Sequence, residues 1–363
     1  MRLVTLMWFG AGIAGLAMVS VTLAQTPDLR PPRIPLGVLG DSDSHAYGDT
    51  ILLREPRLRG GSYRKTTYQW TEALERLRGR ELDQGQWHVW GMHGRLAPVA
   101  RALGLEGRTP RKRDFRYNFA WSGAGCENLN VGVTRQTAGL LYLMRREKER
   151  WRNGVVVIRI GINSVGHQSA FDAYAAHGRS PEADARIEDC IGQIRATVTA
   201  IRAEHPTTRL VLVGISDEAS SPVKATRWPH PEQHARIVEV LDHFDGLLRD
   251  FESSDANIAF FDDRQWMRSY WGGKDALDRT TKDVNLGGPV PVTAAASGDH
   301  PRHAVLADDH AGSVLNALWA KDLIALLRDR FGLTLTPLTQ AEIAQLVDPG
   351  GSFGLAPPSP KRP

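Results

Sequence analysis

The sequence predicts an α/β fold, in which helices cover both faces of a mostly parallel sheet to give a three-layer α/β/α sandwich. Apolar, β-branched runs alternate with amphipathic segments along the chain, which is typical of this class. The clearest strand, 154–160, is a continuous run of Val and Ile of the kind buried on both faces of a sheet. The clearest helix, 182–204, places Ile187, Ile191 and Ile194 on one face. In such sheets ligands bind beyond the carboxyl ends of the strands.

The remaining elements follow the same alternation. The first buried strand is expected at 34–39, and the helix at 67–78 carries Trp70 and Leu74 at helical spacing. Pro206 ends the long helix, because proline lacks the backbone N–H that a helix needs. Further strands are predicted at 117–121, 209–213 and 257–261, and further helices at 95–103, 136–150, 231–251 and 312–331.

Composition limits the class of protein. The chain has 363 residues and is 42% hydrophobic, which suffices for one large domain or two small ones with a sizeable core. The net charge is +4, and the arginines are scattered without a nucleic-acid-binding motif. We therefore interpret them as solvated surface and expect neither a nucleic-acid partner nor a cofactor.

The N-terminus resembles an export signal. Met1 and Arg2 precede an apolar run, and Ala24 offers a small-residue cleavage site, so 1–24 is interpreted as a secretory signal peptide. An uncleaved membrane anchor is the alternative; no later stretch could span a bilayer, so no stable membrane insertion is expected after cleavage. We expect an exported protein, periplasmic or secreted.

The mature chain divides into one domain and a tail. The domain is expected over 25–331, with an insertion at about 46–114 between its first strands. A C-terminal extension follows at 332–363 and is predicted to be disordered from Asp348 because of its Gly and Pro content. The two cysteines, Cys126 and Cys190, could form a disulfide in an exported protein, and two buried free thiols are the alternative.

Four short motifs lie at the ends of predicted strands or just before the last long helix. They are Gly40-Asp41-Ser42-Asp43-Ser44, Ser122-Gly123-Ala124, Gly161-Ile162-Asn163 and Asp308-Asp309-His310-Ala311-Gly312-Ser313. In this order they resemble the blocks of the SGNH (GDSL-like) hydrolase superfamily of serine esterases, over roughly residues 34–331. The resemblance implies a flavodoxin-like order of strands in the sheet.

The resemblance also implies residue roles that suit ester cleavage. Ser42 would be the nucleophile, and His310 the base that removes its proton near neutral pH. The oxyanion would be stabilised by the Ser42 and Gly123 N–H groups and the Asn163 side-chain amide, each typically worth roughly 3 kcal/mol of barrier.

The acid that orients the histidine departs from the family pattern. The family places it three residues before the histidine, where this chain has Ala307. We choose Asp308 as the orienting acid, because a residue adjacent to the histidine usually points elsewhere; Asp309 and a dyad without a carboxylate remain open. Ser164 also stands where the family often has aspartate, but that acid is not an oxyanion donor.

Three functional hypotheses follow. Exported esterases of this family act on acetylated sugars, lipids and other small esters, so the first is a secreted carbohydrate O-deacetylase or short-chain esterase whose partner is a small-molecule or glycan ester. The second is a catalytically inactive SGNH-fold domain that binds a glycan or a protein. The third is metal-assisted hydrolysis at the His/Asp cluster 299–310, although no metal is assigned to it. The sequence does not assign an oligomeric state.

Overall fold

The computed structural model describes residues 32–54, 58–216, 218–224, 226–272 and 282–357, so the expected signal peptide at 1–24 lies outside the described residues. The central sheet has five parallel strands in the order β2-β1-β5-β6-β7. Its strands are β1 (Ile34–Gly40), β2 (Leu82–Asp83), β5 (Val155–Arg159), β6 (Arg209–Val213) and β7 (Ile258–Phe261). This is the flavodoxin-like order, in which the first strand of the chain, β1, lies inside the sheet.

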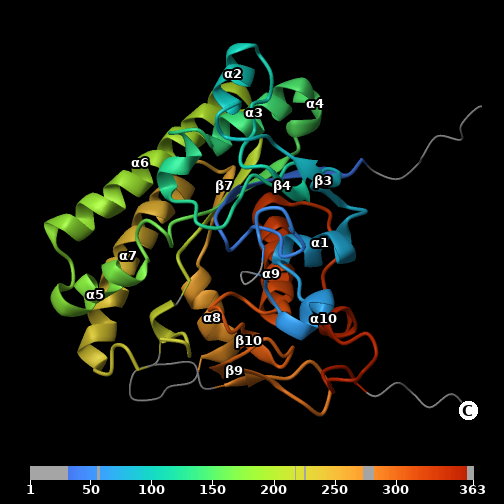
Figure 1. Ribbon diagram of the computed structural model, residues 1–363, viewed down its shortest axis with the longest axis vertical. Helices are drawn as coiled ribbons and strands as arrows, with labels where there is room; N and C mark the ends of the chain where they lie inside the picture. The colour runs from blue at the N-terminus through green and yellow to red at the C-terminus, as the bar shows by residue number, and fades with distance from the viewer. Residues whose placement is uncertain (1–31, 55–57, 217, 225, 273–281, 358–363) are drawn as a thin grey trace, which may run out of the picture. The chain divides into compact units, whose positions relative to one another are not determined.

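Helices cover both faces of this sheet, as predicted. One face packs against α3 (Gln136–Arg146), α6 (Pro181–Glu204) and α7 (Pro231–Ser254), and the other against α1 (Trp70–Arg78), α8 (Asp263–Trp271), α9 (Ser313–Phe331) and α10 (Gln340–Val347) (Figure 1). Successive side chains of a strand point to opposite faces, so Val156 and Ile158 join the first core while Val155 and Val157 join the second.

The expected insertion at 46–114 is more structured than its sequence indicates. It holds α1 and α2 (Ala97–Ala102), but it also supplies β2 at the edge of the main sheet. A separate antiparallel pair joins β3 (Trp87–Trp90) to β4 (Lys112–Phe115). The segment predicted as a strand at 117–121 contributes only a bridge from Asn118 to Val38.

The helix predicted at 136–150 is divided into α3 and α4 (Lys148–Trp151). Several other short elements are not predicted from the sequence. They are α5 (Gln168–His177), α8 and the strands β8 (Asp283–Val284), β9 (Val292–Ser297) and β10 (His303–Val305), besides the short helices η1 (Gly61–Thr66), η2 (Cys126–Leu129) and η3 (Glu218–Ser220). The three strands form a small sheet of their own, ordered β10-β9-β8. Strand β9 is mostly Ala, Thr and Ser, so its pairing depends on neighbours rather than on its own propensity.

The C-terminal extension differs from expectation. Residues 348–357, predicted to be disordered, are placed against the second core, where Leu355 is fully buried. The Asp348 carboxylate accepts the N–H groups of Phe353 (3.1 Å) and Leu355 (3.0 Å) and so closes this turn. Residues 358–363 lie outside the described part of the chain.

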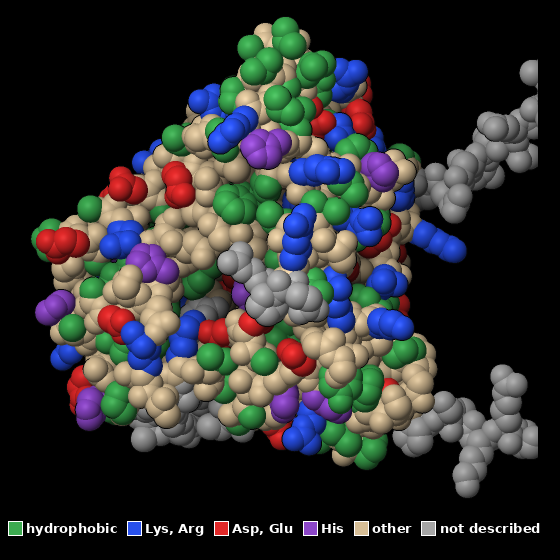
Figure 2. Space-filling view, in the orientation of Figure 1, with side chains coloured by type: hydrophobic (Ala, Val, Ile, Leu, Met, Phe, Trp, Pro, Cys, Tyr) green, Lys and Arg blue, Asp and Glu red, His purple; other side chains and the backbone are tan. Residues whose placement is uncertain are grey.

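Exposed apolar side chains gather over α2 and the loop beside it (Figure 2). They are Leu96, Val99, Leu103, Leu105, Val131 and Val133. The Arg101 guanidinium ties the two segments together by donating to the Val133 carbonyl at 2.9 Å. Within the described ranges, no helix is both long and apolar enough to cross a membrane.

Candidate active site

Ser42 lies on a tight turn directly after β1. Gln136 forms two hydrogen bonds with Gly40, the last residue of β1. The Gln136 side-chain oxygen accepts the Gly40 N–H, and the Gln136 side-chain NH₂ donates to the Gly40 carbonyl, both at 2.8 Å. A Cβ on Gly40 would lie 2.3 Å from the Arg159 carbonyl oxygen, so only glycine permits this approach of β1 to β5. The Asp41 carbonyl then accepts the His45 N–H at 3.1 Å, which turns the chain and leaves Ser42 8% exposed.

The two loops with the other expected oxyanion donors are bonded to each other. Gly123 is exposed and has φ +93°, a left-handed conformation that favours glycine. The Asn163 side chain follows β5 and donates to the Ala124 carbonyl at 2.9 Å. A second bond runs from the Cys126 N–H to the Ser164 hydroxyl at 2.8 Å. Gly123 and Asn163 therefore lie at one edge of the sheet.

A disulfide joins Cys126 to Cys190, with their Cα atoms 5.1 Å apart. It connects η2, just after the Gly123 loop, to the middle of α6. The structure thus decides between the two states that the sequence left open, and it places the covalent link beside the candidate site.

His310 forms a hydrogen bond with Asp308, whose Oδ2 lies 3.0 Å from the imidazole Nδ1. Burial alone would raise the pKa of Asp308, but the hydrogen bond with His310 and the charge of Arg59 hold that pKa well below its usual range. Asp309 turns away, because its backbone is left-handed at φ +70° and its carboxylate bonds to Ser221 and to Lys224 (2.7 Å).

Arg59 is the buried residue of this site that the sequence did not indicate. Its Nε donates to Asp308 Oδ2 at 3.1 Å, and its Nη2 lies 2.8 Å from His310 Nε2. Because a guanidinium can only donate, His310 Nε2 must accept, and the proton of the ring lies on Nδ1 beside Asp308. The same Nη2 is 3.5 Å from the Ser122 hydroxyl, so Arg59 connects the histidine loop to the Gly123 loop.

Ser42 and His310 are not hydrogen-bonded to each other in the part of the chain that the structure describes. The Ser42 carbonyl accepts a hydrogen bond from the Gln69 side-chain amide at 3.2 Å. The nitrogen that would accept the serine proton is instead occupied by Arg59. In the structure, Nε2 of His310 therefore faces the Arg59 guanidinium and not the Ser42 hydroxyl.

Ser122, His45 and Asp49 form a hydrogen-bonded Ser–His–Asp chain. The buried His45 accepts from the Ser122 N–H at 3.2 Å and contacts the Ser122 hydroxyl at 2.9 Å through Nδ1. Its Nε2 lies 2.9 Å from the carboxylate of Asp49, which is also fully buried. Since Nδ1 accepts a backbone N–H, the proton lies on Nε2 and points to Asp49.

Burial keeps this second histidine neutral. Desolvation lowers the pKa of His45, and the nearby charge of Lys112 lowers it further. Burial would raise the pKa of Asp49, but its bonds with His45 and the Arg113 N–H lower it overall. The sequence signal was the spacing His45-x-x-x-Asp49, four residues apart on a turn, which is too common to be informative alone.

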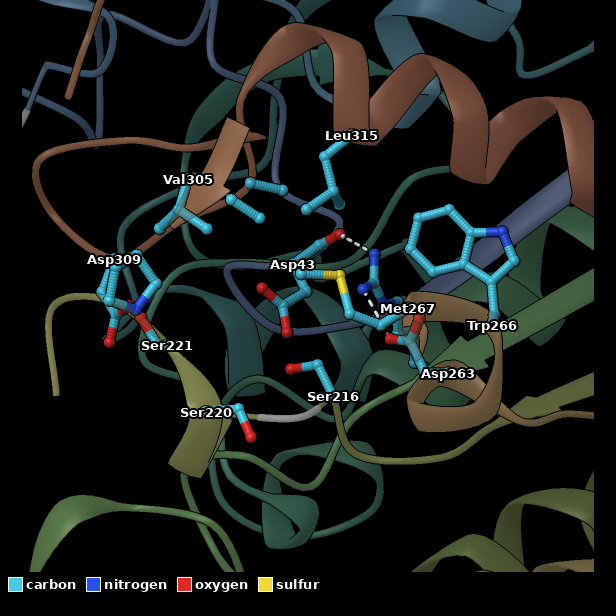
Figure 3. Close-up of a pocket in the computed structure, with 14 residues that line it drawn as sticks. Asp43, Ser216, Ser220, Ser221, Asp263, Trp266, Met267, Val305, Asp309 and Leu315 are labelled. Atoms are coloured by element: carbon cyan, nitrogen blue, oxygen red, sulfur yellow. Dashed lines mark hydrogen bonds and ion pairs between the residues drawn. The ribbon is translucent and has the colours of Figure 1, made fainter. Parts of the chain in front are cut away.

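A pocket enclosing about 590 Å³ of space, part of it open to solvent, begins beside the candidate residues. Asp43, which follows Ser42, and Asp309 and Ala311, which flank His310, line it. Figure 3 shows the Asp43 carboxylate and the Ser216 hydroxyl turned toward each other inside the pocket. Apolar walls are contributed by Met267, Val305, Trp266 and Leu315. The ion pair of Arg159 and Asp263 (2.7 Å) closes the wall next to Asp43.

Within the His/Asp cluster 299–310, His300 packs against aromatic rings, whereas Asp308 and His310 belong to the candidate site. The His300 ring lies edge-on to Tyr63 and Phe353, with ring centroids 4.9 and 5.4 Å apart. Among the residues with described positions, no three His, Cys, Asp or Glu side chains form a group that could hold a metal ion. The metal-assisted alternative gains no support from this region.

Comparison with models of known protein families gives no match, and neither does comparison with curated proteins. The function therefore has to be argued from the geometry of the site alone.

Proposed function

We propose that the protein is a serine ester hydrolase of the SGNH type, with Ser42 as nucleophile and His310 as base. The observation that carries the proposal is the meeting of three loops at Arg59, whose Nη2 contacts both His310 and Ser122. A histidine paired with a carboxylate is thereby brought next to the loop of Gly123. That loop lies beside the end of β1, where the Trp121 N–H donates to the Gly40 carbonyl. The disulfide of Cys126 and Cys190 suits an exported protein.

In the proposed reaction, Arg59 first leaves His310 Nε2. The Ser42 hydroxyl then attacks the ester carbonyl while Nε2 takes its proton, and Asp308 stabilises the imidazolium through Nδ1. The Ser42 and Gly123 N–H groups and the Asn163 amide donate to the oxyanion. Collapse expels the alcohol, which takes the proton from His310, and water then releases the acid by the same steps in reverse.

The lining of the pocket beside Asp43 favours an ester whose alcohol portion is polar, such as a sugar that carries an O-acetyl group. Within the described ranges no group bonds to the Asp43 carboxylate, which can accept from sugar hydroxyls, while Met267 and Leu315 can contact the C–H faces of a ring. We therefore propose O-acetyl groups on carbohydrates as substrates ahead of long-chain esters.

A catalytically inactive binding domain is the second candidate. The observation in its favour is the occupied His310 Nε2, because a base held by a guanidinium cannot accept a serine proton in that state. In this case the pocket beside Asp43 would bind a glycan without cleaving it.

Labelling with a fluorophosphonate, which phosphonylates activated serines, separates the two. Peptide mapping of the labelled protein should identify Ser42, and labelling should disappear in both Ser42→Ala and His310→Ala. Labelling at Ser122 would instead assign the nucleophile to the chain of Ser122, His45 and Asp49. No labelling of folded protein would contradict the hydrolase and favour the binding domain.

A further inference from the structure

Arg59 is a cation built into the site with one donor unused. The residue is 5% exposed, and its Nη1 is buried without a hydrogen-bond partner among the described residues. A buried guanidinium donor without a partner is costly, so such groups are normally satisfied by a ligand, a water or another side chain. The other two nitrogens are occupied by Asp308 and by His310.

The backbone after Arg59 holds the guanidinium in place. Gly60 and Gly61 both have left-handed conformations, with φ +86° and +47°. A Cβ on Gly60 would lie 2.2 Å from the Thr67 hydroxyl, and one on Gly61 would lie 2.7 Å from the Asp299 carboxylate. The Tyr47 ring lies 4.9 Å from the guanidinium carbon and supports it from one side. This close packing is typical of a positioned side chain rather than of a surface arginine.

The charges around Arg59 indicate which kind of ligand its unpaired Nη1 would bind. When His310 accepts a proton, its imidazolium faces the guanidinium nitrogen that now lies 2.8 Å away. Among the described residues, Asp308 is the one carboxylate that contacts both side chains. A second anion bound to Arg59 would balance the additional positive charge and draw the guanidinium off His310 Nε2. The unpaired Nη1 is the donor of Arg59 that remains to bind such an anion.

We propose that Arg59 is a specificity-determining residue that binds an anionic group, a carboxylate or a phosphate, on the ester substrate. This inference rests on the proposed function and names its substrate class: an ester with an anion near the scissile bond, in its acid or its alcohol portion. Binding of the anion to Nη1 frees His310 to act on Ser42, so recognition and activation are one step.

Matched esters test the inference with the full-length protein. The first pair is 3-acetoxybenzoate and the neutral 3-acetoxybenzamide, and the second is phenyl hydrogen glutarate and phenyl pentanoate, which place the charge on the alcohol and on the acid side. We expect kcat/KM to favour the anionic member of at least one pair by tenfold or more. Arg59→Gln should abolish this preference mainly through KM, and Arg59→Lys should retain part of it.

Arg54→Gln is the matched control, because Arg54 is an exposed arginine of the same loop. Arg54→Gln should leave the preference for the anionic ester intact. If Arg54→Gln lost the preference as fully as Arg59→Gln, general surface charge would explain it and the inference would be overturned. The inference is also overturned if wild type shows no preference, or if Arg59→Gln lowers both members of each pair alike, which would assign Arg59 to the oxyanion or to packing.

Binding separates this inference from the proposed function. Calorimetry on Ser42→Ala should detect benzoate but not benzamide, and adding Arg59→Gln should remove the signal. If wild type hydrolyses no ester but benzoate binds through Arg59, the hydrolase proposal fails and the anion site stands. If esters are cleaved and benzoate does not bind, the anion site fails and the hydrolase stands.

Discussion

His310 Nδ1 lies 3.0 Å from Asp308 Oδ2, whereas Asp309, its immediate neighbour in the chain, is paired with Lys224 instead. The left-handed backbone at Asp309 (φ +70°) separates the two carboxylates by turning one toward the ring and the other away from it. The geometry thereby gives the two acids different expected roles.

Asp308→Asn should lower kcat by about 10²–10⁴-fold with little change in KM, because the imidazolium loses its counter-charge. Asp309→Asn is the matched control and should cost less than about tenfold. The pKa of Asp308 lies below its ordinary value of 3.8, so Asp308 should not titrate in the wild-type activity profile above that pH. Steady-state kinetics from pH 4 to 9 measure both, and a larger loss in Asp309→Asn would reverse the assignment.

Gly123→Ala should reduce kcat by about tenfold or more. The new methyl group has no steric clash, because its nearest neighbour is Trp121 at 3.8 Å. The loss of activity would come from the backbone, since alanine disfavours φ +93° and relaxing that angle would move the Gly123 N–H away from the oxyanion. Gly104→Ala is the control, since Gly104 also has a left-handed φ (+71°) and open space around it. Both should lose about 1–2 kcal/mol of stability. Equal kinetics in the two variants would remove Gly123 from the oxyanion site.

His45 should make the protein less stable in mild acid. Its pKa is lowered in the folded state by burial, so below pH 6.5 the unfolded chain binds a proton that the native protein does not. The full contribution of neutral His45 to the free energy of unfolding is therefore present above pH 6.5, and it is lost as the pH falls below that value. Urea unfolding at pH 7, 6 and 5 should show a shallower decline in His45→Gln than in wild type.

The exposed His88 supplies the control for that experiment, and His88→Gln should keep the wild-type slope. An unchanged slope in His45→Gln would mean that the buried chain of Ser122, His45 and Asp49 does not contribute to acid sensitivity.

Removing the disulfide should destabilise the protein by about 2–4 kcal/mol, because the link closes a loop of 64 residues in the unfolded chain. The double variant Cys126→Ser/Cys190→Ser is compared with wild type by thermal unfolding, with and without reductant. Reductant should lower the Tm of wild type alone. Because Cys126 follows the Gly123 loop, kcat should also fall in the variant; an unchanged Tm would contradict the structural role of the link.

The sequence by itself determined the layers of the fold. Continuous apolar runs such as 154–160 can be buried only between two layers, and the long amphipathic helix now seen at Pro181–Glu204 has one face to cover them. These signals are local and strong, so the parallel sheet and most of its helices could be predicted. Weak local signals were not sufficient for β9, whose pairing comes from its neighbours, or for residues 348–357, which are ordered by contacts with the second core.

The contacts between loops, unlike the strands and helices, could not be predicted from local sequence patterns. Motif order placed Ser42, Gly123, Asn163 and His310 at strand ends or before α9, and their catalytic roles stay predictions. Only the tertiary structure decided that Asp308 faces His310, that Cys126 bonds to Cys190, and that Arg59 occupies the histidine nitrogen. Arg59 lies 251 residues from His310 in the chain, and His45 lies 77 from Ser122. Contacts over such separations depend on how the loops close over the sheet, and no local pattern encodes them.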